Sequence, residues 1–269
     1  MAGGRSPRLS PDGKRVAFTA EAATNTREVF VMTLPNGVPT RLTFTPENES
    51  DVEWLPSGQR LIFSQTSATS ASQWTIFSKS ADGAGQAEKI AEGSEPTVSP
   101  DGKSMVYARD DQFWSIALAA DGKPAPFLTA PNKELFQPAI SPDGRFVAYG
   151  STETGEPQIY VRPYPDGDAK WQISTAKGGF PRWNRRGDRI YFLDATNTLM
   201  EVEIETRPTV SWKAPRKLFT SSPLDRTWDV APDGRILAWT PVESGKGEAV
   251  PSMIVTENWF SEFKDKRKK

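Results

Sequence analysis

Residues 138–149 read PAISPDGRFVAY, a tight turn between two apolar runs. In the turn, Pro142 presets the backbone angle φ, Asp143 bonds local backbone N–H groups and Gly144 accepts a positive φ. The runs on either side are rich in β-branched and aromatic residues, as strands are. The segment therefore predicts two antiparallel strands joined by a hairpin turn.

The same strand–turn–strand pattern occurs six times along the 269 residues. Successive copies are 42 to 47 residues apart, measured between the anchor glycines Gly13, Gly58, Gly102, Gly144, Gly187 and Gly234. Each unit continues with further short strands, for example 158–161 (QIYV) and 170–173 (KWQI). Four antiparallel strands in a repeat of about 40–45 residues are typical of a β-propeller blade. We therefore expect an all-β, six-bladed propeller with four-stranded blades.

The repeat predicts one propeller domain over residues 1–263, followed by a basic tail over residues 264–269. The expected blades cover residues 5–44, 45–92, 93–130, 131–176, 177–220 and 221–263. The last unit offers only three strands, and too few residues precede the first unit to supply a fourth. We therefore expect a three-stranded last blade whose edge is covered by the aromatic residues of 258–263, because an open edge invites association. A fragment of a seven-bladed parent is the alternative.

The composition excludes several classes of chemistry. The chain has 0 His and 0 Cys, which removes Ser-His-Asp and Cys-His catalysis, disulfides and Cys- or His-ligated metal sites. With 33 basic and 34 acidic side chains the net charge is −1, which offers no basic surface for nucleic acid. No apolar run reaches the roughly 18–20 residues of a transmembrane helix, and residues 1–6 lack the apolar core of a signal peptide. We expect no catalytic residue, no metal, no cofactor and no membrane insertion.

The repeated Ser-Pro-Asp-Gly-(Lys/Arg) pattern resembles that of the TolB-like, WD-repeat-like propellers of bacteria, over about residues 5–263. Residues 158–165 (QIYVRPYP) and 258–264 (NWFSEFK) are similar to the propeller that many bacterial Ser/Thr kinases carry at the C-terminus. The resemblance implies a periplasmic or other extracytoplasmic module that senses or binds proteins. It implies no catalytic residue.

The candidate binding site follows from the expected topology. In a propeller, the loops after the second and fourth strands of every blade share one rim, and the short Pro-Asp-Gly turns form the other. The loops that lead into the first strand of each blade would surround the mouth of the central channel on the loop-rich rim. The residues expected at this mouth, where a protein or peptide would bind, are Arg5, Asp51, Glu95, Phe136, Gln137, Phe180 and Arg226.

Two other functions compete with a binding module. Asp51 and Glu95 come from neighbouring blades and have the chemistry of a glycosidase carboxylate pair, which makes a carbohydrate-active hydrolase the enzymatic alternative. A structural role in assembly is the third hypothesis, because the edge of the last blade offers a surface for an oligomer.

Overall fold

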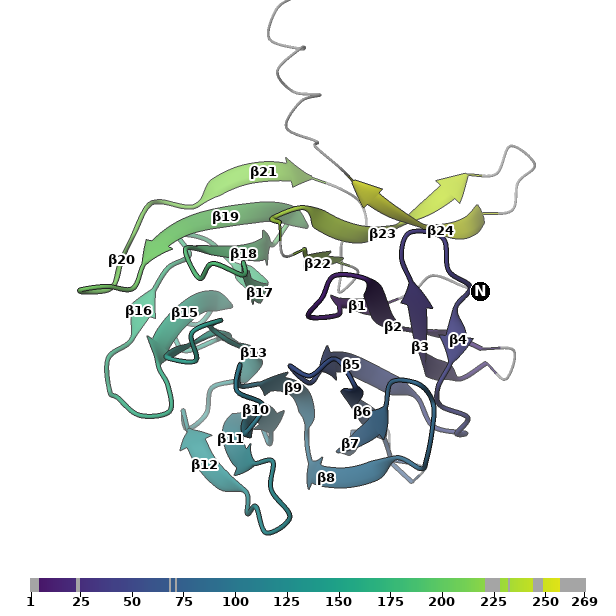
Figure 1. The fold of residues 1–269 in the computed structure, drawn as a ribbon. Coiled ribbons are helices and arrows are strands. Elements are labelled where there is room, and N and C mark those ends of the chain that lie inside the picture. Colours follow the sequence, from purple (N-terminus) through teal and green to yellow (C-terminus); the bar gives the residue numbers. More distant parts are fainter. Residues whose placement is uncertain are drawn as a thin grey trace, which may run out of the picture.

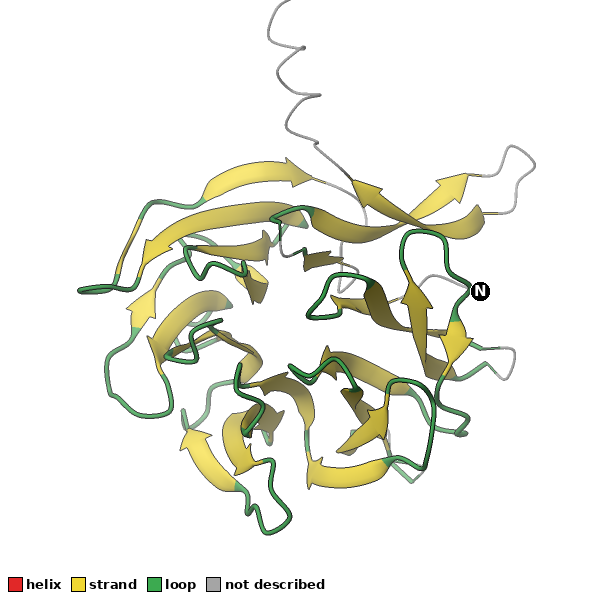
Figure 2. Cartoon of the chain, viewed as in Figure 1, coloured by secondary structure: helices red, strands yellow, loops and turns green. Residues whose placement is uncertain are grey.

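The computed structural model describes residues 5–22, 25–67, 69–70, 72–220, 228–231, 233–243 and 249–256, with side chains through Ala238. Six antiparallel sheets stand around a central opening (Figure 1). Strands and loops make up this entire part of the chain, which contains no helix (Figure 2). The expected all-β propeller is therefore confirmed.

Within each sheet the strands follow one another from the channel outward in sequence order. The first sheet contains β1 (Arg5–Leu9), β2 (Arg15–Glu21), β3 (Arg27–Thr33) and β4 (Thr40–Arg41). The second contains β5 (Glu49–Trp54), β6 (Arg60–Thr66), β7 (Trp74–Ser80) and β8 (Glu88–Glu92). The third contains β9 (Ser94–Val98), β10 (Ser104–Arg109), β11 (Gln112–Ala117) and β12 (Ala125–Leu128).

The remaining sheets differ in strand number. The fourth contains β13 (Leu135–Ile140), β14 (Phe146–Ser151), β15 (Gln158–Pro163) and β16 (Trp171–Gln172). The fifth contains β17 (Gly178–Trp183), β18 (Arg189–Asp194) and β19 (Thr198–Glu205), and both β20 (Ser211–Trp212) and β21 (Arg216–Thr220) pair with β19. The C-terminal sheet contains β22 (Trp228–Val230), β23 (Ile236–Glu243) and β24 (Ala249–Thr256).

The expectation of a six-bladed propeller is wrong: the structure has five blades with at least four strands each. The C-terminal sheet has three strands in the described part of the chain and does not form a sixth blade of this kind. The physical reason is that a Pro-Asp-Gly turn requires only the two strands that it joins. Six copies of the turn therefore predict six pairs of inner strands, but they do not predict that every pair is completed to a four-stranded blade. The aromatic residues of 258–263 and the basic tail lie outside the described residues.

The turns form as their residue types predict. In the fourth blade, Ser141 Oγ donates to Asp143 Oδ1 at 2.7 Å, and the same oxygen accepts the backbone N–H of Arg145 at 3.1 Å. Gly144 has a φ of +70°, which is the left-handed region that favours glycine. The carboxyl group of Asp143 is thus used to hold the hairpin closed.

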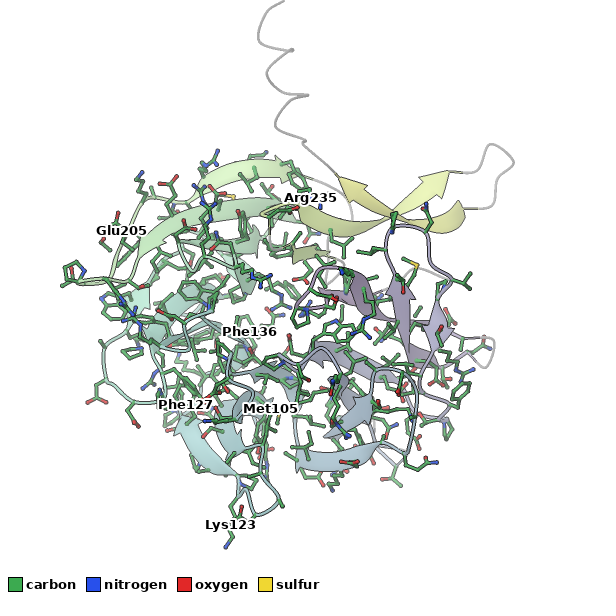
Figure 3. The ribbon with its side chains drawn as sticks, viewed as in Figure 1. Met105, Lys123, Phe127, Phe136, Glu205 and Arg235 are labelled. Carbon is green, nitrogen blue, oxygen red and sulfur yellow. The ribbon has the colours of Figure 1, made fainter. Side chains whose placement is uncertain are left out.

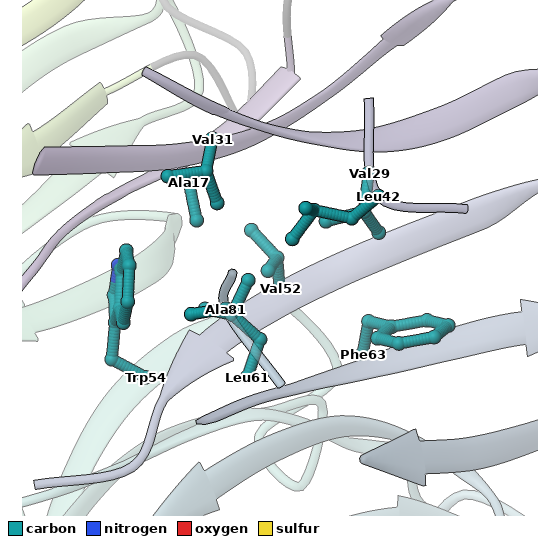
Figure 4. Close-up of a cluster of buried hydrophobic side chains, with 9 residues drawn as sticks. All are labelled: Ala17, Val29, Val31, Leu42, Val52, Trp54, Leu61, Phe63 and Ala81. Carbon is teal, nitrogen blue, oxygen red and sulfur yellow. The ribbon is translucent and has the colours of Figure 1, made fainter. Parts of the chain in front are cut away.

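Apolar side chains from facing sheets fill the space between the blades. Between the first two blades, for example, Val29 and Val31 pack with Leu61, Phe63 and other buried side chains of the second blade (Figure 4). Trp54 belongs to this cluster and donates its indole N–H to the carbonyl oxygen of Arg8 at 2.9 Å.

The ring closes by packing and hydrogen bonding. Leu237 of β23 packs with Val16, Phe18 and Phe30 of the first blade. On the channel side, the backbone N–H of Leu9 donates to Oδ2 of Asp229 at 2.8 Å. No described residue of the C-terminal sheet pairs with a strand of the first sheet.

Candidate functional site

Every blade has the same backbone irregularity in its innermost strand. In β1, β5, β9, β13 and β17 the pairing with the second strand is interrupted by a β-bulge. At each bulge one non-glycine residue has a positive φ, between 50° and 59°; these residues are Ser6, Asp51, Glu95, Gln137 and Phe180. A bulge redirects a side chain that regular pleating would point elsewhere, and bulges are common beside functional sites.

The five bulge residues meet in one cavity of about 40 Å³ in the channel. Four of them, Asp51, Glu95, Gln137 and Phe180, are residues that the sequence analysis expected at the channel mouth. The remaining wall comes from Ser6, Arg8, Arg182, Trp228 and two prolines. We call this cavity the channel mouth.

Hydrogen bonds between neighbouring blades hold the bulge residues in place. Glu95 accepts the backbone N–H of Gln137 through Oε2 at 2.6 Å. Gln137 in turn accepts the backbone N–H of Phe180 through Oε1 at 2.5 Å. Each side chain therefore satisfies the N–H group that the next bulge removes from the sheet. Since Phe180 has no acceptor in its side chain, it cannot continue the series.

The other three expected residues lie elsewhere. Arg5 begins β1 with an exposed side chain and does not line the channel mouth. Phe136 faces its cross-strand partner Gly150, where a Cβ atom would lie 2.1 Å from the ring atom Cε2. Arg226 lies outside the described residues.

Phe136 instead lines a larger groove beside the channel mouth. This groove has a volume of about 690 Å³, and its walls include Trp74, Arg109, Asp110 and Glu95. Figure 3 labels Phe136 next to the central opening, whereas Lys123 lies at the outer tip of the third blade. Because Glu95 lines both hollows, the groove adjoins the channel mouth on the loop-rich rim.

A second ring of side chains lies deeper in the channel. Five of its members stand two positions after a bulge residue, and the sixth, Asp229, comes from β22, the inner strand of the C-terminal sheet. The members are Arg8, Glu53, Thr97, Ala139, Arg182 and Asp229. All six line a cavity of about 450 Å³ that extends to the prolines of four hairpin turns. Arg8 and Arg182 line both cavities and therefore lie where the two meet.

The two carboxyl groups of the second ring, those of Glu53 and Asp229, have raised pKa values. Arg8 Nε lies 3.2 Å from Oε2 of Glu53. The channel wall surrounds Glu53, whose side chain keeps 28% of its surface accessible. The resulting desolvation raises the pKa of Glu53 to about 7, and the nearby charge of Arg8 only partly opposes this rise. Burial likewise raises the pKa of Asp229.

The channel wall also contains residues that were not expected there from the sequence: Ser6, Arg8, Arg182 and Trp228. A signal for Arg182 was present, since it stands two positions after Phe180, which was expected at the channel mouth. Side chains two apart on a strand point to the same face.

The described residues contain no cluster of three or more acidic, His or Cys side chains that would hold a metal. They also contain no helix long and apolar enough to cross a membrane.

Radial antiparallel sheets and a channel lined by bulged inner strands define a β-propeller with a candidate binding site at its mouth. Comparison with known proteins shows which propellers the chain is similar to. Residues 2–115 match the family model of the Tricorn protease N-terminal β-propeller domain. The TolB structure from Acinetobacter baumannii superimposes with a TM-score of 0.67 and 17% identity, over 91% of this chain and 61% of that one. The resemblance to TolB-like bacterial propellers is therefore confirmed.

Two curated relatives show the same similarity. The chain is 38% identical to Tricorn protease homolog 1 of Streptomyces coelicolor over 71 residues, which are 26% of this chain and 6% of that protein. It is 28% identical to the Tol-Pal system protein TolB of Francisella tularensis over 180 residues, or 65% of this chain and 41% of TolB. A prolyl endopeptidase structure also shares the fold, with a TM-score of 0.55 over 92% of this chain and 42% of that one. The chain thus spans less than half the length of these curated relatives.

Proposed function

We propose that this propeller is a non-enzymatic binding module that holds a protein or peptide at the channel mouth and the adjoining groove. The observation that carries the proposal is the repeated bulge, which directs a non-glycine side chain into the channel from each of five blades. A left-handed conformation is unfavourable for such residues, so its repetition indicates a constraint beyond sheet formation. Asp51, Glu95, Gln137 and Phe180 would contact the partner in the mouth, and Phe136 in the groove.

Hydrolysis of a carbohydrate fits the site less well. The cavity that Asp51 and Glu95 share measures about 40 Å³, far below the roughly 300–1,000 Å³ of a small-molecule site. Glu95 also accepts a backbone hydrogen bond through Oε2, which fixes its side chain to the next blade. A screen with chromogenic glycosides tests this choice. Turnover that disappears in Asp51→Asn would contradict the binding proposal.

The binding proposal is tested by affinity capture from an extract of the source cells, with quantitative mass spectrometry. The site variants Phe136→Ala and Phe180→Ala should lose the captured partner. Trp212→Ala is the matched control, because this aromatic side chain is exposed on the outer strand β20, away from the channel. Equal capture by all variants would overturn the proposal.

The likeness to TolB also supports an extracytoplasmic location, which we include in the proposal. Fractionation of cells that express the native gene would test it, and recovery with a cytosolic marker would contradict it. The similarity to kinase-linked propellers stays a prediction.

A role in assembly has one supporting observation. In the described part of the chain, β24 is the outermost strand of its sheet and pairs only with β23. An unpaired edge can add a strand from another chain. Light scattering at several concentrations would detect such an oligomer, and a monomer throughout would exclude it.

A further inference from the structure

Two hydrogen-bond donors line the channel mouth from successive blades, the fourth and the fifth. Gln137 uses Oε1 to accept the backbone N–H of Phe180, and this contact orients the side-chain amide. Its Nε2 group has no acceptor among the described residues. Arg182 donates from Nη1 to the carbonyl oxygen of Pro181 at 3.1 Å and forms no ion pair in the described part of the chain.

Arg8 provides a comparison for Arg182, because its guanidinium has a carboxylate partner in the channel. It stands at the same position of its strand as Arg182, two residues after the bulge, and its guanidinium lies 3.2 Å from the carboxylate of Glu53. The neighbours of Arg182 in the second ring are Ala139 and Asp229. Ala139 has no charge, and the Asp229 carboxyl accepts the backbone N–H of Leu9. Arg182 therefore keeps donor capacity that the described residues do not use.

The free volume limits what these donors can hold. The channel mouth measures about 40 Å³, and one water molecule requires roughly 10–15 Å³ on this measure. The space thus suits a group of about three heavy atoms. A carboxylate has this size, and the planar fork of a guanidinium matches its two oxygens.

We propose that the channel mouth binds one carboxylate group, held by the guanidinium of Arg182 and Nε2 of Gln137. The proposal rests on the proposed function and names the chemistry of its partner: an acidic side chain or a chain terminus enters the channel. The ring of Phe180 forms the wall beside the site. Asp51 and Glu95 also line this cavity, so the charge of Arg182 and the Gln137 donor must outweigh their repulsion for a carboxylate to bind.

Side-chain amide signals in a ¹⁵N-labelled sample of the whole chain provide the test. The Gln137 signal, assigned through Gln137→Leu, is followed while sodium acetate is added at constant ionic strength. We expect a saturable shift with acetate and none with sodium chloride or methylammonium chloride. In Arg182→Gln the acetate affinity should fall about tenfold or more, because a charge-assisted hydrogen bond is lost, whereas Arg182→Lys should retain part of it.

The spectra and thermal midpoint of each variant show whether it is folded. An equal shift with chloride, or an acetate affinity unchanged in Arg182→Gln, would overturn the proposal. Two peptides of matched sequence then separate the sources: one carries an internal glutamate and an amidated end, and the other carries glutamine and a free C-terminal carboxylate. Whichever peptide binds in an Arg182-dependent way identifies the source, and binding of neither contradicts the proposal.

Failure here is distinguishable from failure of the binding function. A partner that is lost in Phe180→Ala but captured fully by Arg182→Gln would leave the binding module intact and remove the carboxylate site. If both variants capture the partner as well as the wild-type protein does, the proposed binding function is contradicted, regardless of the result with acetate.

Discussion

Glu95 and Gln137 are joined across a blade boundary by a hydrogen bond of 2.6 Å, from the backbone N–H of Gln137 to Oε2 of Glu95. Both residues occupy the bulge of their strand and have a φ of 54°. The bulge removes the N–H of Gln137 from its own sheet, and the neighbouring blade supplies the acceptor. The channel wall is therefore built by contacts between blades as well as within them.

Two replacements of Glu95 should distinguish the contribution of its hydrogen-bond acceptor to stability from the contribution of its charge. Glu95→Ala leaves the N–H of Gln137 without this acceptor, which costs about 1–3 kcal/mol of the free energy of unfolding. Glu95→Gln keeps an acceptor oxygen and should cost clearly less. Urea denaturation of both variants measures the difference, and equal costs would show that the hydrogen bond is unimportant.

Glu49 should make the protein less stable as the pH rises. Burial, together with the nearby charge of Glu28, raises the pKa of Glu49 to about 7 from 4.5, and Oε2 of each residue lacks a hydrogen-bond partner. Between these two values the unfolded chain has lost a proton that the folded protein retains. The free energy of unfolding should therefore fall with rising pH, by at most about 1.4 kcal/mol per pH unit for this group.

Urea denaturation at several pH values from 4.5 to 8 tests this slope. Glu49→Gln should flatten it, although Glu53, whose pKa is also raised to about 7, contributes in the same window. Glu88→Gln is the control, since the Glu88 side chain is 70% exposed. A slope that is the same in Glu49→Gln and in the wild type would contradict the prediction.

Gly150 should be required for the position of Phe136. A Cβ atom at residue 150 would meet the Phe136 ring at 2.1 Å, so Gly150→Ala must displace the ring, at a cost of about 1–3 kcal/mol. The double variant with Phe136→Ala removes the clash. Its cost should be less than the sum of the single costs, which a double-mutant cycle on unfolding free energies measures. Additive costs would mean that the two residues do not interact.

Asp229 should control closure of the ring. Asp229→Ala removes the acceptor for the backbone N–H of Leu9, so this amide should exchange with deuterium faster than in the wild type. Asp229→Asn keeps an acceptor and should preserve slow exchange. The amide of Ile140, which donates to Thr97 Oγ1 at the corresponding place in the fourth blade, is the internal reference. Unchanged exchange at Leu9 in Asp229→Ala would show that packing alone closes the ring.

The sequence predicted the propeller class because its evidence is local. A turn such as 141–144 is specified by neighbouring residues, whose hydrogen bonds and φ values hardly depend on the rest of the chain. The number of complete blades is not local, since it depends on whether further strands pair beside each hairpin. Six turns therefore led to six expected blades, and the structure has five.

The channel residues show the same division between local and tertiary information. Alternation along a strand points successive side chains to opposite faces, and a bulge shifts that alternation by one residue. The shift brings Ser6 rather than Arg5, and Gln137 rather than Phe136, into the channel mouth. Composition and spacing determined that polar and aromatic residues would gather at this rim. Only the tertiary structure decided which of them share a cavity, because the bulges depend on how two strands pair and the bonds between blades join residues more than 40 positions apart.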